Sequence, residues 1–260
     1  MSGRPWFSLQ GRTVLVAGAS RGIGLAIARE MARAGAETFL AARSLEALQR
    51  EAEALRSEGC RAEALRLDLC DRASIETAVR ALPEVNVLVN VAGTNLRKRF
   101  LDYTEQEYEA LLATNLDGVV RLRRQVGQGM IERGRGGKII VIGSLMTILG
   151  LPYMVPYAIS KSGLAGLVRV LAAEWACHGI QVNAILPGFI LTELTRPIWE
   201  KPEMRTWLRS LLPAGRLGSP EDIAPLAVFL AGPGSDYITG QLIAVDGGYS
   251  TTALWPLQPV

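Results

Sequence analysis

The residues with the clearest chemical potential in this sequence are a tyrosine and a lysine four positions apart, Tyr157 and Lys161. On a helix, two side chains at this spacing share a face and lie one turn from each other. A free tyrosine has a pKa near 10, and roughly 4 kcal/mol of phenolate stabilisation would bring it toward 7. An ammonium at about 4–5 Å supplies roughly 3–4 kcal/mol at an effective dielectric constant of about 20. The pair can therefore serve as a general acid and base.

Ser144 and the scarcity of histidine support this interpretation. Ser144 follows an expected strand, thirteen positions before Tyr157, where its hydroxyl would hold the oxygen of a carbonyl or alkoxide. The only histidine, His178, precedes Gly179 and is expected to end a helix. A site with several histidine ligands or a Ser-His-Asp triad is therefore not expected, and we predict no metal site.

A glycine-rich loop, Gly18-Ala-Ser-Arg-Gly22-Ile-Gly24, follows the first expected strand and precedes a helix. Glycines in this place allow a tight turn and close approach of the backbone to a pyrophosphate, whose charge the helix N-terminus favours. The spacing is G-x-x-x-G-x-G rather than the commoner G-x-G-x-x-G, so the loop alone is weak evidence. Its position between a strand and a helix makes a nucleotide site a stronger prediction.

The end of the second expected strand favours a particular cofactor. Dinucleotide-binding folds usually place an acidic residue there, which binds the ribose 2′-hydroxyl of NAD. Here the strand ends Phe39-Leu-Ala-Ala-Arg43-Ser44, with no carboxylate. A guanidinium suits a 2′-phosphate, and Arg21 in the glycine loop could close on the same group. We predict a preference for NADPH/NADP+, with NADH not excluded; the alternative is two solvated arginines.

The elements that must position these residues are short apolar runs alternating with longer helical ones. Continuous apolar strands are typical of a parallel sheet buried on both faces. Strands are expected at residues 13–17, 38–42, 64–67, 85–89, 138–142, 181–185 and 242–245. Helices are expected at residues 23–33, 45–56, 72–81, 105–132, 158–176 and 221–230. This order predicts an α/β doubly wound Rossmann fold, with a mostly seven-stranded parallel sheet and helices on both faces.

Composition limits the remaining possibilities. With 49% apolar residues and a net charge of +3, disorder and nucleic-acid binding are not expected. No linker divides the chain, so we expect one domain over residues 1–260, with a substrate lid at about residues 190–213 that includes Trp199, Met204 and Trp207. Three scattered cysteines and the lack of a signal-peptide core fit a cytoplasmic protein without a membrane span.

In these motifs the sequence resembles the short-chain dehydrogenase/reductase family, over residues 9–249. The resemblance rests on the order and spacing of several motifs rather than on any one of them. They are the glycine loop, Asp68, Asn90-Val-Ala-Gly93, Asn115, Ser144, the Tyr157–Lys161 pair, Asn183-Ala-Ile-Leu-Pro187-Gly188, Thr192 and Val245-Asp-Gly-Gly-Tyr249. The sequence departs from the family's N-N-A-G motif, because valine replaces the second asparagine.

The resemblance implies a hydride-transferring oxidoreductase with four catalytic residues, Asn115, Ser144, Tyr157 and Lys161. Tyr157 would be the general acid and base, Lys161 would hold the nicotinamide ribose, and Asn115 would position a water for proton relay. The expected cofactor-binding residues are Gly18, Ser20, Arg21, Gly22, Ile23, Gly24, Arg43, Asp68, Leu69, Asn90, Ala92, Gly93, Tyr157, Lys161, Pro187, Gly188, Ile190 and Thr192. The family also implies a homotetramer or homodimer with the helices at 105–132 and 158–176 in its interfaces.

The substrate is less clearly defined. Arg97-Lys98-Arg99 follows the Asn90–Gly93 turn and could attract an anion, such as a sugar-acid carboxylate or a phosphopantetheine-linked acyl group; the alternative is a solvated loop. Short segments of the sequence are similar to sugar-acid ketoreductases of the gluconate 5-dehydrogenase type, and others are equally similar to 3-oxoacyl-acyl-carrier-protein reductases. A small-molecule carbonyl or alcohol is expected in either case. Two alternative functions from other classes are not excluded. One is a non-catalytic dinucleotide sensor, and the other is an interaction protein that uses the small residues of the 158–176 helix.

Overall fold

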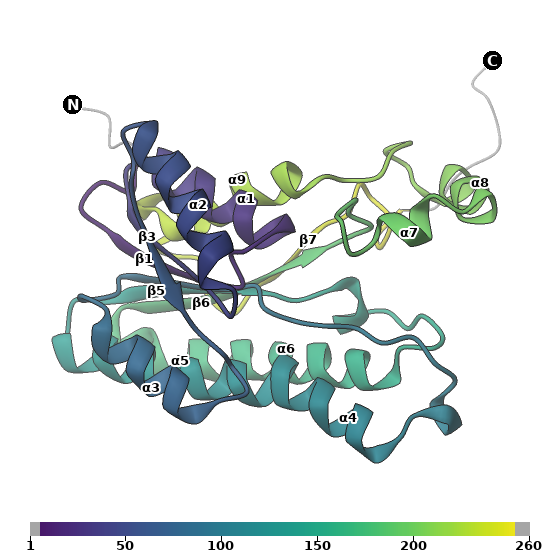
Figure 1. The fold of residues 1–260 in the computed structure, drawn as a ribbon, viewed down its shortest axis with the longest axis horizontal. Helices are drawn as coiled ribbons and strands as arrows, with labels where there is room; N and C mark the ends of the chain where they lie inside the picture. Colours follow the sequence, from purple (N-terminus) through teal and green to yellow (C-terminus); the bar gives the residue numbers. More distant parts are fainter. Residues whose placement is uncertain (1–5, 253–260) are drawn as a thin grey trace.

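The computed structural model describes residues 6–252, without the side chains of residues 205 and 209. Its centre is a seven-stranded parallel sheet with the strand order β3-β2-β1-β4-β5-β6-β7 (Figure 1). The strands are β1 (Thr13–Ala17), β2 (Glu37–Ala42), β3 (Arg61–Arg66), β4 (Val87–Asn90), β5 (Gly137–Ile142), β6 (Ile180–Pro187) and β7 (Leu242–Val245). The order reverses between β1 and β4, which makes the sheet doubly wound as predicted.

Helices cover both faces of the sheet (Figure 1). One face carries α1 (Gly22–Arg33), α2 (Leu45–Ser57) and α9 (Pro220–Ala231), and the other carries α3 (Arg72–Ala81), α4 (Glu105–Leu112), α5 (Gly118–Arg133) and α6 (Val155–Trp175). Two further helices, α7 (Arg196–Trp199) and α8 (Pro202–Leu211), project beyond the sheet. Short 3-10 turns lie at Phe100–Asp102, Leu145–Thr147, Ala176–His178 and Pro233–Ser235. None of the helices in residues 6–252 is both long and apolar enough to cross a membrane.

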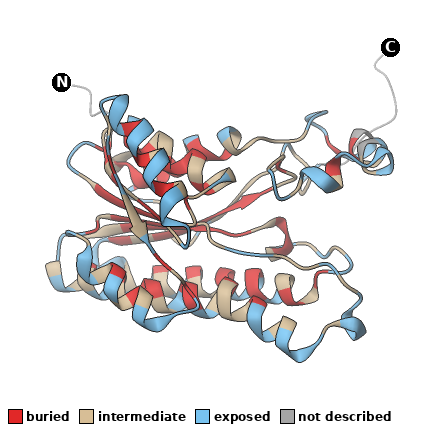
Figure 2. Ribbon diagram, viewed as in Figure 1, coloured by how far each residue is buried: buried red, intermediate tan, exposed pale blue. Residues whose placement is uncertain are grey.

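The central strands are mainly apolar and buried because both of their faces are covered (Figure 2). In β1 every residue is buried, and successive side chains enter opposite cores. Val14 and Val16 pack with α1, α2 and α9, whereas Leu15 and Ala17 pack with the helices on the other face. The edge strand β3 alternates instead, and it spans residues 61–66 rather than the expected 64–67.

The helix expected over residues 105–132 is interrupted. It divides into α4, a π-helical turn at Ala113–Asp117, and α5. Gly118 follows this turn, and a Cβ built on it would lie 2.3 Å from the carbonyl oxygen of Leu69. Only glycine therefore fits where the helix passes the end of β3. The wider turn carries Asn115, and single π turns of this kind are frequent at functional sites.

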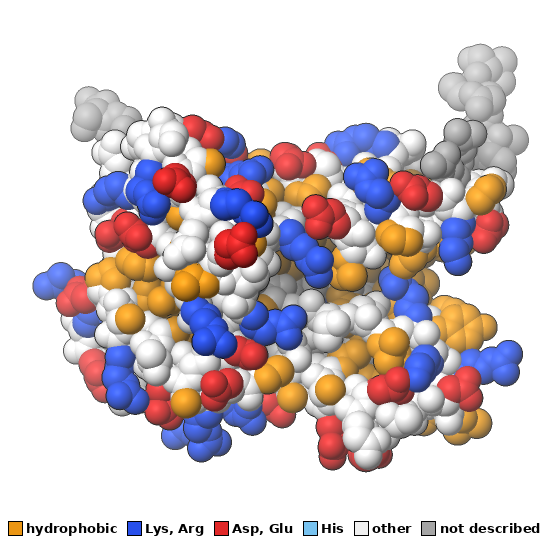
Figure 3. Space-filling view, in the orientation of Figure 1, with side chains coloured by type: hydrophobic (Ala, Val, Ile, Leu, Met, Phe, Trp, Pro, Cys, Tyr) orange, Lys and Arg blue, Asp and Glu red, His pale blue; other side chains and the backbone are white. Residues whose placement is uncertain are grey.

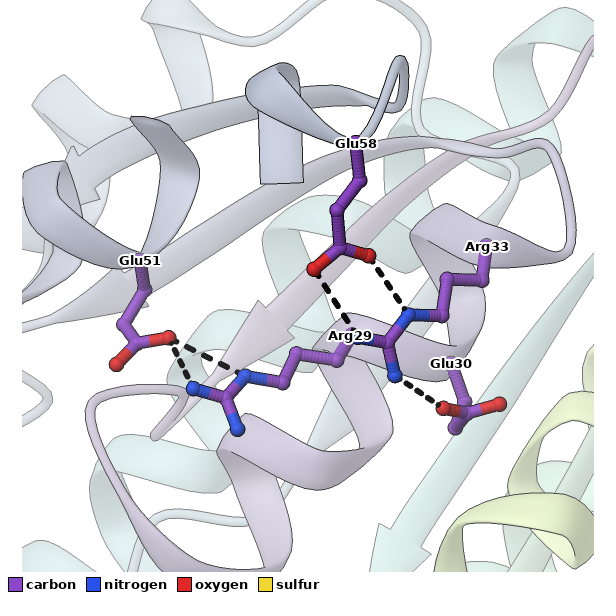
Figure 4. Close-up of polar contacts among 5 residues, drawn as sticks. All are labelled: Arg29, Glu30, Arg33, Glu51 and Glu58. Atoms are coloured by element: carbon purple, nitrogen blue, oxygen red, sulfur yellow. Dashed lines mark hydrogen bonds and ion pairs between the residues drawn. The ribbon is translucent and has the colours of Figure 1, made fainter. Parts of the chain in front are cut away.

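On the face of the sheet that α1 and α2 cover together, ion pairs join these two helices (Figure 4). Arg29 Nη2 lies 2.6 Å from Glu51 Oε2, and Arg33 Nε lies 2.9 Å from Glu58 Oε2. Arg33 also contacts Glu30 at 2.9 Å, and its hydrogen bond to Glu58 lowers the pKa of that carboxyl. Because these pairs are partly exposed, we expect them to orient the two helices and to add little to the free energy of unfolding.

Two smaller expectations concern His178 and the cysteines. His178 is the last residue of a 3-10 turn, and Gly179 follows it with a φ of +70°, as a helix end requires. Cys60, Cys70 and Cys177 are free thiols. His178 therefore has the expected helix-end position.

Candidate active site

The predicted site residues follow the carboxyl ends of neighbouring strands. Gly18 follows β1, Asn90 ends β4, Ser144 follows β5, and Gly188 follows β6. Carboxyl ends of parallel strands meet at one edge of a sheet, and ligands bind there where the strand order reverses. The space-filling view is hollowed between the part carrying α7 and α8 and the part carrying α4 (Figure 3). The sheet therefore gathers the predicted residues around one depression.

The glycine loop is as tightly packed as its sequence requires. Gly18 has a φ of +95°, and a Cβ on it would lie 2.6 Å from the backbone nitrogen of Ala92. A Cβ on Gly24 would lie 2.0 Å from the carbonyl oxygen of Gly18. Arg21, the residue before α1, makes no side-chain cap, so the first amides of this helix stay open to a ligand. The loop therefore fits a pyrophosphate.

Tyr157 and Lys161 lie in the first turns of α6, as their spacing predicts. The helix begins with Val155, and Pro156 occupies a first-turn position where its missing amide costs nothing. Lys161 is 3% exposed, donates a hydrogen bond from Nζ to the carbonyl oxygen of Ile142 at 2.9 Å, and lies 5.6 Å from the centroid of the Tyr157 ring. The strand β5, through Ile142, and the helix α6 therefore hold the ammonium beside the phenol.

Ser144 lies next to Tyr157, between β5 and a 3-10 turn. Its Oγ accepts a hydrogen bond from the backbone nitrogen of Met146 at 3.2 Å, which orients the hydroxyl. A hydrogen bond with Ser144 lowers the pKa of Tyr157. The serine and the tyrosine can therefore contact one substrate oxygen together.

The electrostatics of the pair differ from the sequence-based expectation. Burial raises the pKa of Tyr157, and this outweighs the lowering by Ser144 and by the charge of Arg97. Burial also lowers the pKa of Lys161 to about 8, with help from the charge of Arg123. The expectation that the charge of Lys161 brings the pKa of the tyrosine toward neutrality did not include the desolvation of the phenolate. Tyr157 is accordingly protonated at neutral pH, the form in which a general acid acts.

Asn115 is buried and fixes the turn beside the lysine. Its Oδ1 accepts from the backbone nitrogen of Thr94 and its Nδ2 donates to the carbonyl oxygen of Thr94, both at 2.8 Å. A Cβ on Gly93 would lie 3.4 Å from Asn115 Oδ1 and 3.5 Å from Lys161 Nζ. The side chain of Asn115 thus shapes the turn beside Lys161, and its role in positioning a water stays a prediction.

Near the ends of β1 and β2, Arg21 and Arg43 are exposed, and neither forms an ion pair with a described residue. Asp68 is half-buried, and its Oδ1 accepts from the backbone nitrogen of Cys70 at 2.9 Å. Leu69 is buried against Gly118. The two guanidinium groups are therefore available to an anion.

Asn90 is 2% exposed, and neither atom of its amide has a hydrogen-bond partner among the described residues. An unpartnered buried amide is costly, so one at the end of a strand fits contact with a ligand or an ordered water.

At the opposite end of the site, the expected residues lie in the segment that leaves β6. A Cβ on Gly188 would lie 2.6 Å from the Cα of Asp246, so β6 and β7 end in close contact. Ile190 is buried, and Thr192 Oγ1 lies 3.1 Å from Thr195 Oγ1. The Cγ2 of Thr192 lies 3.6 Å from a Cβ built on Gly22, which brings this segment against the glycine loop.

The sequence did not identify two buried polar residues, one beside Tyr157 and one in α5. Ser160 donates to the carbonyl oxygen of Tyr157 at 2.7 Å and lies 3.4 Å from Asn115 Nδ2. Its place inside the Tyr157–Lys161 segment was the available signal. Arg123 is fully buried in α5, where a charged residue on an otherwise apolar helix face was the signal.

Comparison with known proteins places this arrangement among oxidoreductases. The family model described as enoyl-(acyl carrier protein) reductase matches residues 18–250. The gluconate 5-dehydrogenase of Gluconobacter oxydans (strain 621H) is 35% identical over 256 residues, which cover 97% of this chain and 100% of that protein. The 3-oxoacyl-acyl-carrier-protein reductase of Vibrio cholerae is 37% identical over 245 residues, with 93% and 98% covered.

Solved structures agree with this similarity. The crystal structure of a gluconate 5-dehydrogenase from Burkholderia cenocepacia, in complex with NADP and tartrate, has a TM-score of 0.91 and 36% sequence identity. The match covers 95% of this chain and 98% of that one. The fold and nearly the full length of the chain are therefore shared with these enzymes.

Proposed function

The chain belongs to the short-chain dehydrogenase/reductase family, an oxidoreductase family that acts on alcohol and ketone groups with a nicotinamide cofactor, and we propose that it uses NADP(H) and Tyr157 to interconvert a carbonyl and a secondary alcohol. The observation that carries the proposal is the contact of Tyr157 with Ser144 and Lys161, beside the turn at Gly93. A non-catalytic dinucleotide sensor would not require all three side chains.

In the proposed reaction, Ser144 donates a hydrogen bond to the substrate oxygen and Tyr157 donates a proton to it during reduction. Bound NADPH would supply the hydride to the carbonyl carbon. The proton and hydride together convert C=O to CH–OH, and in oxidation the phenolate removes the hydroxyl proton. Lys161, 5.6 Å from the centroid of the Tyr157 ring, would stabilise the phenolate by its charge and would hold the nicotinamide ribose. Asn115 supports both by fixing the Gly93–Thr94 turn.

NADP(H) is the proposed cofactor because Arg43 takes the place of the acidic residue that would favour NAD. Arg43 follows β2, and Arg21 lies in the loop that the pyrophosphate would contact. The related Burkholderia enzyme is described with NADP, and a related structure from Beutenbergia cavernae is also described with bound NADP.

The proposed substrate is a keto-sugar acid, and Arg97 is the residue that favours an anion. Of the three consecutive basic residues, Lys98 is bonded to Glu107, whereas Arg97 is exposed and acts on the pKa of Tyr157. A guanidinium whose charge acts on the phenol could bind a carboxylate on a substrate whose carbonyl meets Tyr157. Tartrate, found in the Burkholderia enzyme, is a dicarboxylate.

A 3-oxoacyl thioester is the second candidate substrate, favoured by the apolar segment above the site. Phe189 contacts Trp199, Trp207 and Tyr249 edge-on, with centroid separations of 5.4, 5.4 and 4.8 Å. We propose that residues 190–213 act as a lid on the single domain formed by residues 1–260, with this aromatic cluster under it. Such an apolar surface would also accommodate an acyl chain.

Turnover assays with a panel of ketones test the function and its substrate class. We expect NADPH oxidation with a keto-sugar acid such as 5-keto-D-gluconate. We also expect Arg97→Met to lower kcat/KM for the acid by about 10–100-fold, the loss of one charge-assisted pair. The exposed Arg99→Met is the matched control and should change it less than about threefold. Reduction of acyl thioesters alone would support the second candidate, and no turnover of any ketone would support the sensor.

We also propose that the chain forms a homotetramer or homodimer through α5 and α6. A groove between these helices is lined by Leu116, Val120, Gly163, Gly166, Leu167 and Val170. Val170 is 53% exposed, and a Cβ on Gly166 would meet nothing within 4 Å, so a second helix can approach closely. Sedimentation equilibrium should give two or four chains per particle, reduced by Gly166→Arg. A monomeric wild-type protein would contradict this interface.

A further inference from the structure

The loop that follows β4 passes the first turns of α6. Near its start, a Cβ on Gly93 would lie 3.5 Å from Lys161 Nζ. Two residues later, Asn95 donates a hydrogen bond from Nδ2 to the sulfur of Met154 at 3.2 Å. Met154 is the residue before α6, and Lys161 lies in the second turn of this helix. These two contacts lie on either side of Tyr157 in the chain, so the loop runs along the part of α6 that carries it.

Tyr103 bonds this loop to the turn that precedes α6. Its hydroxyl donates to the carbonyl oxygen of Leu96 and lies 3.3 Å from the carbonyl oxygen of Tyr153, so one proton is shared between the two segments. The backbone nitrogen of Lys98 donates to the same carbonyl oxygen of Tyr153 at 3.1 Å. Leu96 and Lys98 are the two neighbours of Arg97 in the chain. The backbone on both sides of Arg97 is therefore held at the start of the helix.

Tyr153 has a strained backbone conformation at this contact. Its φ of +69° is the only positive value found for a non-glycine residue within residues 6–252. Such a conformation is uncommon for a bulky side chain and persists where the surrounding structure over-determines it. The two hydrogen bonds to its carbonyl oxygen are contacts of this kind. Because strained residues cluster at functional sites, we take the junction of the loop and the helix as part of the site.

Arg97 is the member of the basic triplet that this arrangement leaves free. Lys98 Nζ bonds to Glu107 of α4, and this bond lowers the pKa of the Glu107 carboxyl. Arg97 is exposed and forms no ion pair with a described residue. Burial raises the pKa of Tyr157, whereas the hydrogen bond with Ser144 and the charge of Arg97 lower it. Arg97 is therefore available to an anionic group of a substrate at Tyr157.

We propose that Tyr103 is a positioning residue that favours anionic substrates, because its hydroxyl fixes the loop carrying Arg97 against the start of the catalytic helix. A carboxylate bound at Arg97 then places the carbonyl of the same molecule at Tyr157, whereas a neutral ketone gains nothing from the position of Arg97. Tyr103 itself does not contact the substrate. The inference rests on the proposed function and on the role proposed for Arg97, and it adds the residue that holds Arg97 in place.

Tyr103→Phe tests the inference, because it removes the hydroxyl and keeps the ring. We expect KM for 5-keto-D-gluconate to rise about 5–20-fold with kcat within about twofold, since a loosened loop weakens carboxylate binding and leaves the proton donor in place. For a neutral ketose such as D-fructose, kcat/KM should change less than about twofold. Tyr108→Phe is the matched control, because this half-buried tyrosine of α4 has a hydroxyl that bonds to no described residue; it should leave both substrates unaffected.

A double-mutant cycle separates the placement of Arg97 from a general effect on the fold. In the Arg97→Met background, Tyr103→Phe should change KM for the acid less than about twofold, because the group that it positions is gone. Calorimetric titration of the NADP+-loaded enzyme with tartrate, a dicarboxylate, gives the same cycle without turnover. Tyr103→Phe should weaken tartrate binding only where Arg97 is present.

An unchanged KM in Tyr103→Phe, equal losses for the acid and the neutral ketose, or additive effects in the double variant would overturn the inference. If Arg97→Met impairs use of the acid and Tyr103→Phe does not, only the role of Tyr103 fails. A wild-type enzyme that reduces no ketone would instead remove the proposed function. An Arg97→Met enzyme with unchanged KM for the acid would remove the proposed substrate contact, and the role of Tyr103 with it.

Discussion

Replacing Tyr157 with phenylalanine is expected to lower kcat by about 10²–10⁴-fold, the usual contribution of a general acid or base. The substitution removes one hydroxyl and leaves the ring that Lys161 Nζ approaches at 5.6 Å. Because Lys161 also bonds to the carbonyl oxygen of Ile142, its position does not depend on the phenol. Affinity for NADP+ should therefore stay within about threefold of the wild type, as the loss acts on the proton alone.

Stopped-flow or steady-state assays of NADPH oxidation, with cofactor binding measured by fluorescence titration, check both halves of this expectation. Tyr237→Phe is the matched control, because that tyrosine is fully exposed and should show wild-type turnover. A Tyr157→Phe enzyme with near-normal kcat would show that another group transfers the proton. Loss of NADP+ binding together with kcat would instead assign Tyr157 to the cofactor site.

The parts of the fold predicted correctly are those whose residues obey a local pattern. β1 and β5 each contain a continuous apolar run, at residues 14–17 and 139–142, as burial on both faces of the sheet requires. The Tyr157–Lys161 spacing likewise needs only one helix to bring the two side chains together. Local periodicity was sufficient for these elements because neighbouring residues in the chain determine them.

The features that were missed depend on contacts between distant residues. The π turn around Asn115 arises where Gly118 passes Leu69, a contact of residues 49 positions apart in sequence. The raised pKa of Tyr157 depends on burial by several elements, which no spacing rule reports. The helices α7 and α8 lie within the segment that was expected as a lid, and their helical structure was not predicted. Their apolar residues pack on Phe189 and Tyr249, which lie outside this segment.

Replacing Arg43 with leucine is expected to reduce the preference for NADPH over NADH by about 10–100-fold, through kcat/KM for NADPH. One hydrogen-bonded ion pair to a phosphate contributes about 1.5–3 kcal/mol, and each 1.4 kcal/mol corresponds to tenfold. Arg43 is exposed and free of ion pairs with the described residues, so its removal breaks no contact of the fold. NADH lacks the 2′-phosphate, and kcat/KM for NADH should therefore change little.

The ratio of the two kcat/KM values, measured at one ionic strength, separates a specific contact from general attraction. Arg50→Leu on α2 provides the comparison, because it removes an equal charge from an exposed residue that already pairs with Glu46 at 3.3 Å. Equal losses for both cofactors would place Arg43 at the shared pyrophosphate rather than at the ribose. An unchanged ratio would leave Arg43 a solvated residue and remove the electrostatic reason for preferring NADP(H). A selective loss, in contrast, would assign cofactor choice to the end of β2, where a single guanidinium stands in place of the carboxylate that would favour NAD.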